Sequence, residues 1–394
     1  MTFMEMLTNC DGQTSITNKV SNKTLNICID VGSTMTRSLM FKPEDVQNNK
    51  LNKELLVTDT ATIQLARPLP SIRTQKTIQD NLECVLTTST NNWRIVKGSM
   101  RQLLTKESIR MVSSSSKIDQ ATTYQSIIFQ CGLNALCESI QSDTLADVYN
   151  INLTLALPPE DTVDARKEKI VSRLTGVATV EFPRLKKKFN INITDIDIYA
   201  EPIAAAYYYS MNKQTSVTEN IVFLDCGGRS KGAVLTKNGR LVLDGTVTSA
   251  GGGEKFVKEV AENIASRLEV NLPSNEVARK ALDTATLNIG NQTYDIAEDI
   301  DLAKDALAED CADIIRSLLD KTNTKLEEIQ RIVCTGRSFL PSVRNGNIVS
   351  KSLVEFIEEK FQYSDVPISF ERYAADNPIV HGLYYYAVFM QINN

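Results

Sequence analysis

The chain of 394 residues contains a single histidine, His381. Catalysis by a Ser-His-Asp or Cys-His arrangement needs an imidazole beside the nucleophile, and this sequence offers it at one position only. A metal site built from several histidines is excluded for the same reason. We therefore expect chemistry that does not depend on histidine, and a structural role for His381.

Long apolar segments and an excess of basic residues are also missing. No hydrophobic run approaches the roughly 18 residues that a membrane-spanning helix needs, and the first residues lack the basic start of a signal peptide. The 43 Lys and Arg side chains are outnumbered by 48 Asp and Glu, so the charge gives no general footprint for nucleic acid. We expect a cytoplasmic protein that binds neither membranes nor DNA directly.

The eight cysteines form no C-x-x-C pair, so a zinc knuckle is not predicted. Cys28, Cys226 and Cys334 lie in apolar, strand-like runs, where cysteine behaves as a small hydrophobic residue. We expect all eight to be reduced, as in the cytosol. The sequence G-x-x-x-x-G-K-[ST] is absent too, which excludes a P-loop enzyme.

What the chain does contain is a loosely repeated pattern. Apolar runs at 25–31 and 221–225 each end in an Asp-x-Gly turn, and each is followed by a second strand. Strands mixed with amphipathic helices over most of the chain predict an α/β protein, and two similar halves suggest a cleft with one such turn on each wall. Segment 43–120 has only weak periodicity, and no element is predicted there.

The expected strands cover residues 25–31, 38–42, 152–157, 178–182, 191–199, 221–225, 233–236, 240–244, 329–334 and 367–370. The expected helices cover residues 120–139, 161–174, 202–211, 254–270, 297–321, 351–361 and 377 to near the C-terminus.

The first turn, at Asp30, carries residues suited to phosphate. Gly32 allows the backbone to approach an anion closely, and successive amides there form an anion-binding nest. Ser33 and Thr34 add hydroxyl donors, and Arg37 adds a positive charge. Asp30 suits a hydrated Mg²⁺ ion, which prefers carboxylate oxygen and keeps several waters. Taken alone, such a sequence is more often only a turn.

Four other turns carry candidate residues, and each also has an ordinary structural interpretation. Asp225 repeats the first arrangement, in a sequence that also fits the start of a hairpin. Glu201 begins a helix, where it either complements the helix dipole or orients an attacking water. The triplet 251–253 fits a nucleotide contact or a hinge, and 335–338 fits a plain strand-to-helix turn. The candidates are Glu201, Asp225, Gly227, Gly228, Arg229, Gly252, Gly253, Glu254, Thr335, Gly336 and Arg337.

The order of these motifs resembles the actin-like ATPase superfamily, over about residues 25–394. The two phosphate loops resemble 30–37 and 223–228, the connecting segment 199–207, the adenosine loop 333–341 and the closing segment 376–383. The resemblance implies a duplicated, ribonuclease H-like α/β fold of two lobes, with ATP or GTP and Mg²⁺ in the interlobe cleft. It also implies that Asp30 and Asp225 organise the hydrated Mg²⁺ and that Glu201 orients the water for γ-phosphate hydrolysis.

Within this superfamily the chain is most similar to the bacterial plasmid-segregation actins, the ParM-like and Alp-like group. Heat-shock chaperones share the Glu-Pro-x-Ala-Ala-Ala segment, but they carry a substrate-binding domain after the ATPase, so a full chaperone is not expected. A sugar kinase is not expected either, because it would need a sugar-binding Asp that we do not find. The group implies filaments of the protein itself, which move plasmid DNA through a DNA-binding adaptor at a centromere-like site. A non-polymerising ATPase switch and a small-molecule kinase remain as alternatives.

Residues 1–24 are rich in Thr, Asn and Ser and have no periodicity, which predicts a flexible leader. The resemblance divides the remaining chain into a first lobe (25–215 with 377–394) and a second lobe (216–376). It also exposes departures from the superfamily pattern. Arg37 stands where actins usually have Lys, and Arg229 where a small or hydroxyl residue is common. Thr335 and Arg337 replace a Gly and a small residue, which leaves the preference between ATP and GTP open.

Overall fold

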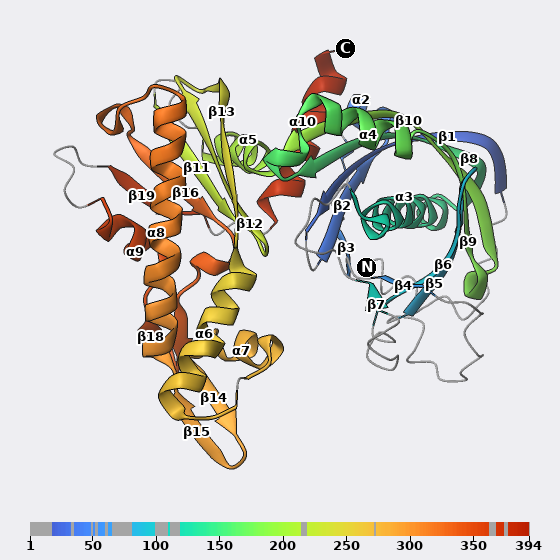
Figure 1. Cartoon of the computed structure of the whole chain (residues 1–394). Coiled ribbons are helices and arrows are strands. Elements are labelled where there is room, and N and C mark those ends of the chain that lie inside the picture. The colour runs from blue at the N-terminus through green and yellow to red at the C-terminus, as the bar shows by residue number, and fades with distance from the viewer. Residues whose placement is uncertain are drawn as a thin grey trace. The chain divides into compact units, whose positions relative to one another are not determined.

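The computed structural model describes residues 18–32, 35–48, 50–51, 54–59, 62–64, 81–98, 109–110, 119–213, 219–271, 273–361, 368–373 and 377–393. The chain forms two units, Met1–Ala200 with Ile379–Asn394, and Glu201–Pro378. Figure 1 labels their helices and strands.

The first unit is built on a sheet of ten strands, in the order β3-β2-β1-β8-β10-β9-β5-β6-β4-β7. They are β1 (Asn18–Val31), β2 (Met35–Phe41), β3 (Leu56–Asp59), β4 (Thr62–Gln64), β5 (Asn81–Thr87), β6 (Asn92–Gly98), β7 (Ile109–Arg110), β8 (Thr144–Leu157), β9 (Gly176–Phe182) and β10 (Lys187–Ala200). The helices of this unit are α2 (Pro43–Gln47), α3 (Ala121–Gln141), α4 (Asp164–Leu174) and α10 (Pro378–Asn393).

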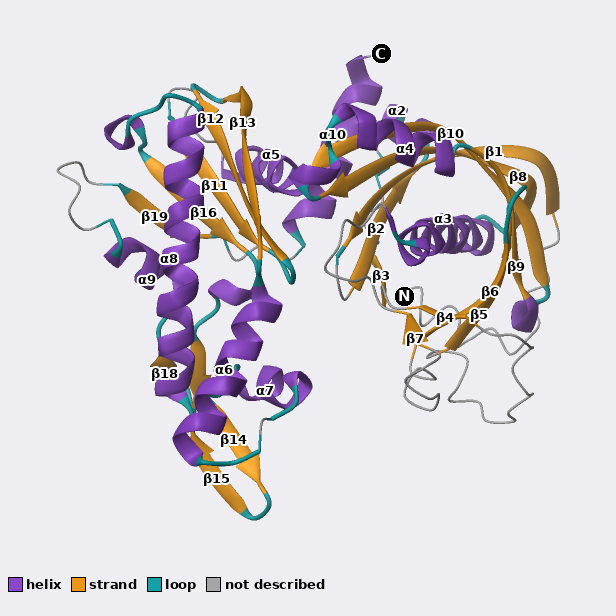
Figure 2. Cartoon of the chain, in the orientation of Figure 1, coloured by secondary structure: helices purple, strands orange, loops and turns teal. Residues whose placement is uncertain are grey.

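Helix α3 lies inside the curl of this sheet, as Figures 1 and 2 show, and is buried along almost its whole length. Its apolar side chains join the core formed by the strands. Gln130 and Asn134 also bring amide groups into this core, and both donate to Ser38 Oγ on β2, at 2.8 and 2.7 Å. Because a buried amide costs free energy unless it is hydrogen-bonded, these two bonds fix α3 against β2.

The second unit contains a five-stranded sheet, in the order β13-β12-β11-β16-β19. Its strands are β11 (Ile221–Cys226), β12 (Ser230–Lys237), β13 (Arg240–Ala250), β16 (Arg331–Thr335) and β19 (Ser369–Arg372), with two separate hairpins, β14 (Thr286–Ile289) with β15 (Gln292–Asp295) and β17 (Ser342–Arg344) with β18 (Asn347–Ser350). The helices are α5 (Glu201–Lys213), α6 (Gly253–Leu268), α7 (Asn275–Ala281), α8 (Ala297–Lys321) and α9 (Leu353–Glu359).

Both faces of the second sheet are covered, because alternate residues of a strand point to opposite sides. Val222 and Leu224 of β11 belong to the core that includes α6 and α8. Phe223 points the other way and packs with Tyr209 of α5, with the ring centroids 5.4 Å apart.

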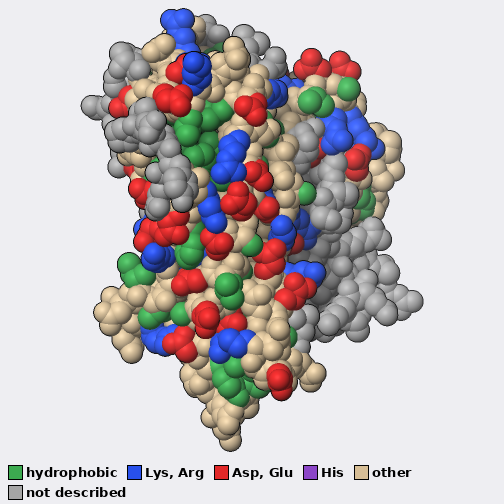
Figure 3. All heavy atoms as spheres, turned by 60° about the vertical axis from the view of Figure 1, so that its left-hand side comes forward, with side chains coloured by type: hydrophobic (Ala, Val, Ile, Leu, Met, Phe, Trp, Pro, Cys, Tyr) green, Lys and Arg blue, Asp and Glu red, His purple; other side chains and the backbone are tan. Residues whose placement is uncertain are grey.

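Figure 3 shows acidic and basic side chains interspersed on one face of the molecule.

The two sheets repeat one topology, as the sequence predicts. The orders β3-β2-β1-β8-β10 and β13-β12-β11-β16-β19 correspond strand for strand. In the first sheet, β1 pairs antiparallel with β2 and parallel with β8, and β8 pairs parallel with β10. In the second, β11 pairs antiparallel with β12 and parallel with β16, and β16 pairs parallel with β19. The duplicated α/β fold is therefore confirmed.

Several details differ from the sequence expectations. Residues 18–24, expected in a flexible leader, belong to β1 and pair with β8, and segment 43–120 contributes strands β3 to β7. Helix α7 and the hairpins β14–β15 and β17–β18 were not expected. The boundary after residue 200 differs from the expected 215, because α5 packs on the second sheet through Ala206 and Tyr209.

Candidate functional site

Three turns of the second unit meet at the ends of β11 and β16. Asp225 is buried on β11 and lies opposite Thr335 of β16 in the parallel register. A Cβ atom on Gly252 would lie 2.3 Å from the carbonyl oxygen of Gly227. Gly336 has φ +123°, and a Cβ atom there would lie 2.3 Å from the carbonyl oxygen of Cys226. Glycine is therefore required at both contacts.

Backbone hydrogen bonds lock the turn at 227–229 onto the start of α6. The N–H groups of Gly251, Gly253 and Glu254 donate to the carbonyl oxygens of Arg229, Gly227 and Gly228, at 2.8, 2.8 and 2.6 Å. In a trans peptide the C=O and the following N–H point in opposite directions. The amides of Gly228 and Arg229 therefore face away from α6, as successive donors of the kind that bind anions.

Arg229 adds a cation to this turn. Its Nε donates to Glu254 Oε2 at 3.0 Å, which holds the side chain beside the start of α6. Its buried Nη1 atom has no hydrogen-bond partner among the residues that the structure describes. A buried guanidinium nitrogen without an acceptor is costly, and an anionic oxygen is the group that would satisfy it.

Arg337 does not face this cluster. Its side chain is 70% exposed and pairs with Asp283 at 3.1 Å. Its neighbour Ser338 lies closer to the turns, since a Cβ atom on Gly253 would lie 2.8 Å from Ser338 Oγ. The part in nucleotide binding that the sequence suggests for Arg337 therefore stays a prediction.

In the first unit, Asp30 and Arg37 are register partners on β1 and β2. Arg37 Nη1 lies 3.3 Å from Asp30 Oδ2 and 3.5 Å from the carbonyl oxygen of Met35, so the guanidinium spans the turn. Gly32 fits the turn because a Cβ atom there would lie 2.6 Å from that same carbonyl. Ser33 and Thr34 lie outside the described residues.

Glu201 is the first residue of α5 and is buried. It follows Ala200, the last residue of β10, so the strand places it directly. An acidic residue at this position also complements the helix dipole, as the structural interpretation requires.

Lys231, the second residue of β12, is 1% exposed and is not among the residues predicted from the sequence. Its Nζ contacts the carbonyl oxygen of Gly251 at 2.9 Å and Asp310 Oδ2 at 2.8 Å. The available signal was a lysine two residues after a candidate turn and directly before an apolar strand segment, Gly232–Leu235. Because charge usually indicates exposure, the segment was expected to form a strand only from residue 233.

No group of three or more His, Cys, Asp or Glu side chains suited to a metal ion occurs within the described ranges. The magnesium contacts predicted for Asp30 and Asp225 run through water, so they stay a prediction.

The seven described cysteines are all buried and free, whereas Cys10 lies outside the described ranges. Burial raises the pKa of Cys28, Cys131 and Cys334, which keeps these thiols protonated and unreactive. Where the chain is described, no helix has the length and hydrophobicity needed to cross a bilayer.

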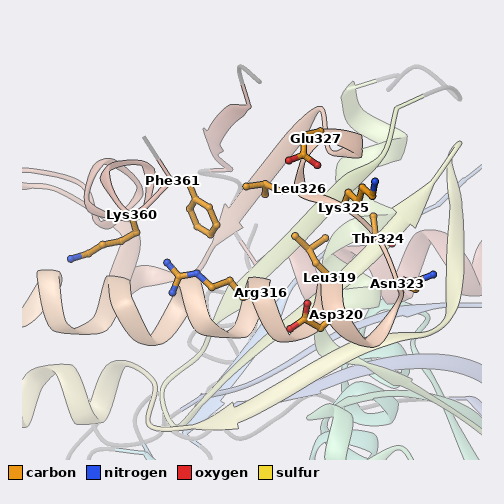
Figure 4. A pocket seen from close by; sticks show the side chains of 10 residues that line it. All are labelled: Arg316, Leu319, Asp320, Asn323, Thr324, Lys325, Leu326, Glu327, Lys360 and Phe361. Carbon is orange, nitrogen blue, oxygen red and sulfur yellow. The ribbon is translucent and has the colours of Figure 1, made fainter. Parts of the chain in front are cut away.

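A groove of about 790 Å³ lies elsewhere in the second unit, near the end of α8. Figure 4 shows Phe361 beside Arg316 and Leu319 facing Leu326, with Lys360 among the charged residues of the rim. The guanidinium carbon of Arg316 stands 5.5 Å from the centre of the Phe361 ring. None of the predicted site residues lines this groove.

Comparison with known proteins gives matches by structure alone. No protein-family model and no curated protein sequence matches the chain. The apo pSK41 ParM protein is 16% identical with a TM-score of 0.60, and the alignment covers 94% of this chain and 99% of that one. The actin-like protein Alp7A is 13% identical with a TM-score of 0.62, covering 94% and 97%. ParM of Bacillus thuringiensis, solved with ATP, is 15% identical with a TM-score of 0.58, covering 94% and 100%. This chain therefore has the actin-like fold, in the form that these ParM proteins share.

Proposed function

We propose that the protein is a nucleotide-dependent, polymerising actin-like ATPase whose filaments segregate plasmid DNA. The observation that carries the nucleotide proposal is the turn at 227–229. Its carbonyl groups all accept from Gly251 or from the first residues of α6, the amides of Gly228 and Arg229 face the other way, and the buried Nη1 of Arg229 lacks a partner among the described residues. Such a turn is suited to a phosphate group, and the similarity to a ParM protein solved with ATP supports the same ligand here.

Residues of both units are proposed to bind phosphate. They are Gly32, Ser33, Thr34 and Arg37 in the first unit, and Gly227, Gly228 and Arg229 in the second. The loop Gly252, Gly253 and Glu254 and the turn Thr335, Gly336 and Arg337 would contact the nucleoside of ATP or GTP.

The donor set fits Mg²⁺, because Asp30 and Asp225 are buried carboxylates at the ends of corresponding strands. Both would hold the hydrated ion, which supplies charge neutralisation at the phosphates when bound. Glu201 would orient the attacking water, by accepting a hydrogen bond from it at the start of α5. Positioning and electrostatic stabilisation would then provide most of the rate.

Filament formation and plasmid segregation rest on the motif order and on the shared fold. The main partner would be a second copy of the chain, and a DNA-binding adaptor would connect the filament to a centromere-like site. We place this assembly in the cytoplasm, without direct contact to DNA or membrane.

The decisive experiment is 90° light scattering of the purified protein before and after addition of Mg-ATP or Mg-GTP, followed by pelleting. We expect a rise that pellets and later decays as nucleotide is consumed. Asp225→Asn should remove the rise, whereas Asp313→Asn, at an exposed carboxylate of α8, should keep it. A flat trace with tight nucleotide binding would indicate a non-polymerising switch. ATP consumption only with an added phosphate acceptor would indicate a kinase.

A further inference from the structure

Lys231 is a charged side chain in the core of the second unit, 1% exposed. It lies opposite Cys226 in the β11–β12 register, directly after the turn at 227–229. Residues opposite one another point to the same face of a sheet, and Cys226 belongs to the core that includes α6 and α8. The lysine therefore extends its ammonium group under the start of α6.

The ammonium has two partners, on two different elements. It donates to the carbonyl oxygen of Gly251 at 2.9 Å and to Asp310 Oδ2 of α8 at 2.8 Å. Lys255 of α6 donates to the same Oδ2 atom at 3.0 Å. Burial acts to raise the pKa of Asp310, but the hydrogen bonds from both lysines outweigh it, and the pKa lies below its usual value. The carboxylate is therefore charged at neutral pH.

Stability alone gives little reason to keep this pair. Removing an ammonium and a carboxylate from water is expensive, and hydrophobic residues of similar volume often stabilise a protein as well or better. Position offers a better reason, because Gly251 is bound on both sides. Its carbonyl oxygen accepts from Lys231, and its N–H donates to the carbonyl oxygen of Arg229 at 2.8 Å.

We propose that Lys231 is a positioning residue of the nucleotide site, a role that rests on the proposed function. Asp310 holds the ammonium, the ammonium holds Gly251, and Gly251 holds the turn at 227–229 in the conformation that presents its amides to phosphate. Lys231 itself touches no phosphate. It acts through the backbone of the loop at 251–254.

The test compares Lys231→Met with Lys304→Met, because Lys304 is an equally buried lysine of the same unit. Lys304 contacts Ser350 Oγ and the carbonyl oxygens of Leu340 and Lys351, outside the glycine loop. Calorimetry would give the dissociation constants of ATP, ADP and adenosine for each variant. We expect Lys231→Met to bind ATP about tenfold more weakly, because one charge-assisted hydrogen bond that positions the loop is lost. The affinity for adenosine should be nearly unchanged, because adenosine has no phosphate. Lys304 also contacts Leu340 of the segment 333–341, so any loss of affinity in Lys304→Met should be equal for ATP, ADP and adenosine.

Hydrogen–deuterium exchange without nucleotide tests the loop directly. We expect faster exchange at residues 251–254 in Lys231→Met and not in Lys304→Met. Should Lys231→Met fail to fold, Asp310→Asn removes the carboxylate charge from the same contact with little change of shape, and we expect a loss of about threefold in ATP affinity.

The outcomes separate the two proposals. A wild type that binds no nucleotide overturns the proposed function and this role together. If the wild type binds ATP, two results overturn the role of Lys231 alone. One is equal ATP affinity in the two Met variants, and the other is an equal loss of affinity for ATP and adenosine in Lys231→Met.

Discussion

At the scale of single residues, the second unit contains two buried lysines with different surroundings. Lys231 meets a carboxylate, whereas Lys304 of α8 meets two carbonyl oxygens and the Ser350 hydroxyl, at 2.9 Å for the last. Burial lowers the pKa of Lys304 to about 8, which the nearby carboxylates of Asp301 and Glu355 offset only in part. A neutral acceptor set thus leaves the cost of burying this charge largely uncompensated.

This lowered pKa predicts a pH dependence of stability. Lysine in an unfolded chain titrates near pH 10.4, so between about pH 8 and 10 the unfolded state binds more protons than the folded state. The contribution of Lys304 to the free energy of unfolding should therefore rise with pH in this window. The buried cysteines, whose pKa values are raised, contribute in the opposite direction, but they do so equally in the wild type and in Lys304→Met. Relative to Lys304→Met, the wild type should gain about 2 kcal/mol between pH 8 and pH 10.

Urea titrations of both proteins at pH 7, 8, 9 and 10 would measure this difference. The titrations stop at pH 10 because burial also raises the pKa values of Tyr149 and Tyr209, each to about 12. Raised tyrosine pKa values lower stability above pH 10, opposite in sign to the lysine effect. A difference between the two proteins that stays constant with pH would show that Lys304 titrates normally.

At the scale of elements, the turns of the second unit depend on close backbone contacts. Gly336 has φ +123° and ψ 156°, a conformation open in practice only to glycine, and its position faces the Cys226 carbonyl. Gly290, in the β14–β15 hairpin, has φ +60° with open space around it. A side chain at Gly290 would meet conformational strain alone, whereas a side chain at Gly336 would meet both strain and steric overlap.

We expect Gly336→Ala to be much more damaging than Gly290→Ala. The control should lose about 1 kcal/mol of stability, the cost of a left-handed alanine. Gly336→Ala should lose at least about 3 kcal/mol, since strain and overlap add, and it should also lose ATP affinity. Thermal unfolding and calorimetry would measure both. Equal unfolding midpoints would contradict the tight packing of the three turns.

The elements that the sequence predicted are those with strong periodicity. Helix α8 was expected at 297–321 and is found there, because its apolar residues recur at helical spacing over seven turns. The strands β3 to β7 were missed because Asn, Gln, Ser and Thr dilute their alternation, and their pairing is set by other strands of the sheet. The β17–β18 hairpin was detectable from Asn345-Gly346, whose left-handed φ values fit a tight turn.

The candidate site shows the same division. Asp30, Asp225, Gly227 and Gly336 could be named because turns after apolar strands are visible in sequence. For Lys231 the sequence offered only a lysine next to an apolar segment, because its role depends on Gly251 and Asp310, which are 20 and 79 residues away along the chain. Contacts of this kind are products of the tertiary fold.

At the scale of the whole molecule, the position of Glu201 predicts that hydrolysis and assembly are separable. Glu201 begins α5, outside the three turns that would hold the nucleotide in the second unit. In the proposed mechanism its carboxylate acts only on the attacking water. A variant without it should therefore bind nucleotide and assemble, yet hydrolyse slowly.

Glu201→Ala is expected to polymerise with Mg-ATP to the same scattering level as the wild type. Its phosphate release should be about a hundredfold slower, the usual loss for a removed catalytic carboxylate, and its filaments should persist longer. Glu298→Ala is a control for the helix-start charge alone, because Glu298 is an exposed acidic residue in the first turn of α8. Both variants lose a favourable dipole contact of about 0.5 kcal/mol. If phosphate release is unchanged in Glu201→Ala, or slows equally in the two variants, Glu201 is only the helix-start carboxylate, and hydrolysis depends on another residue.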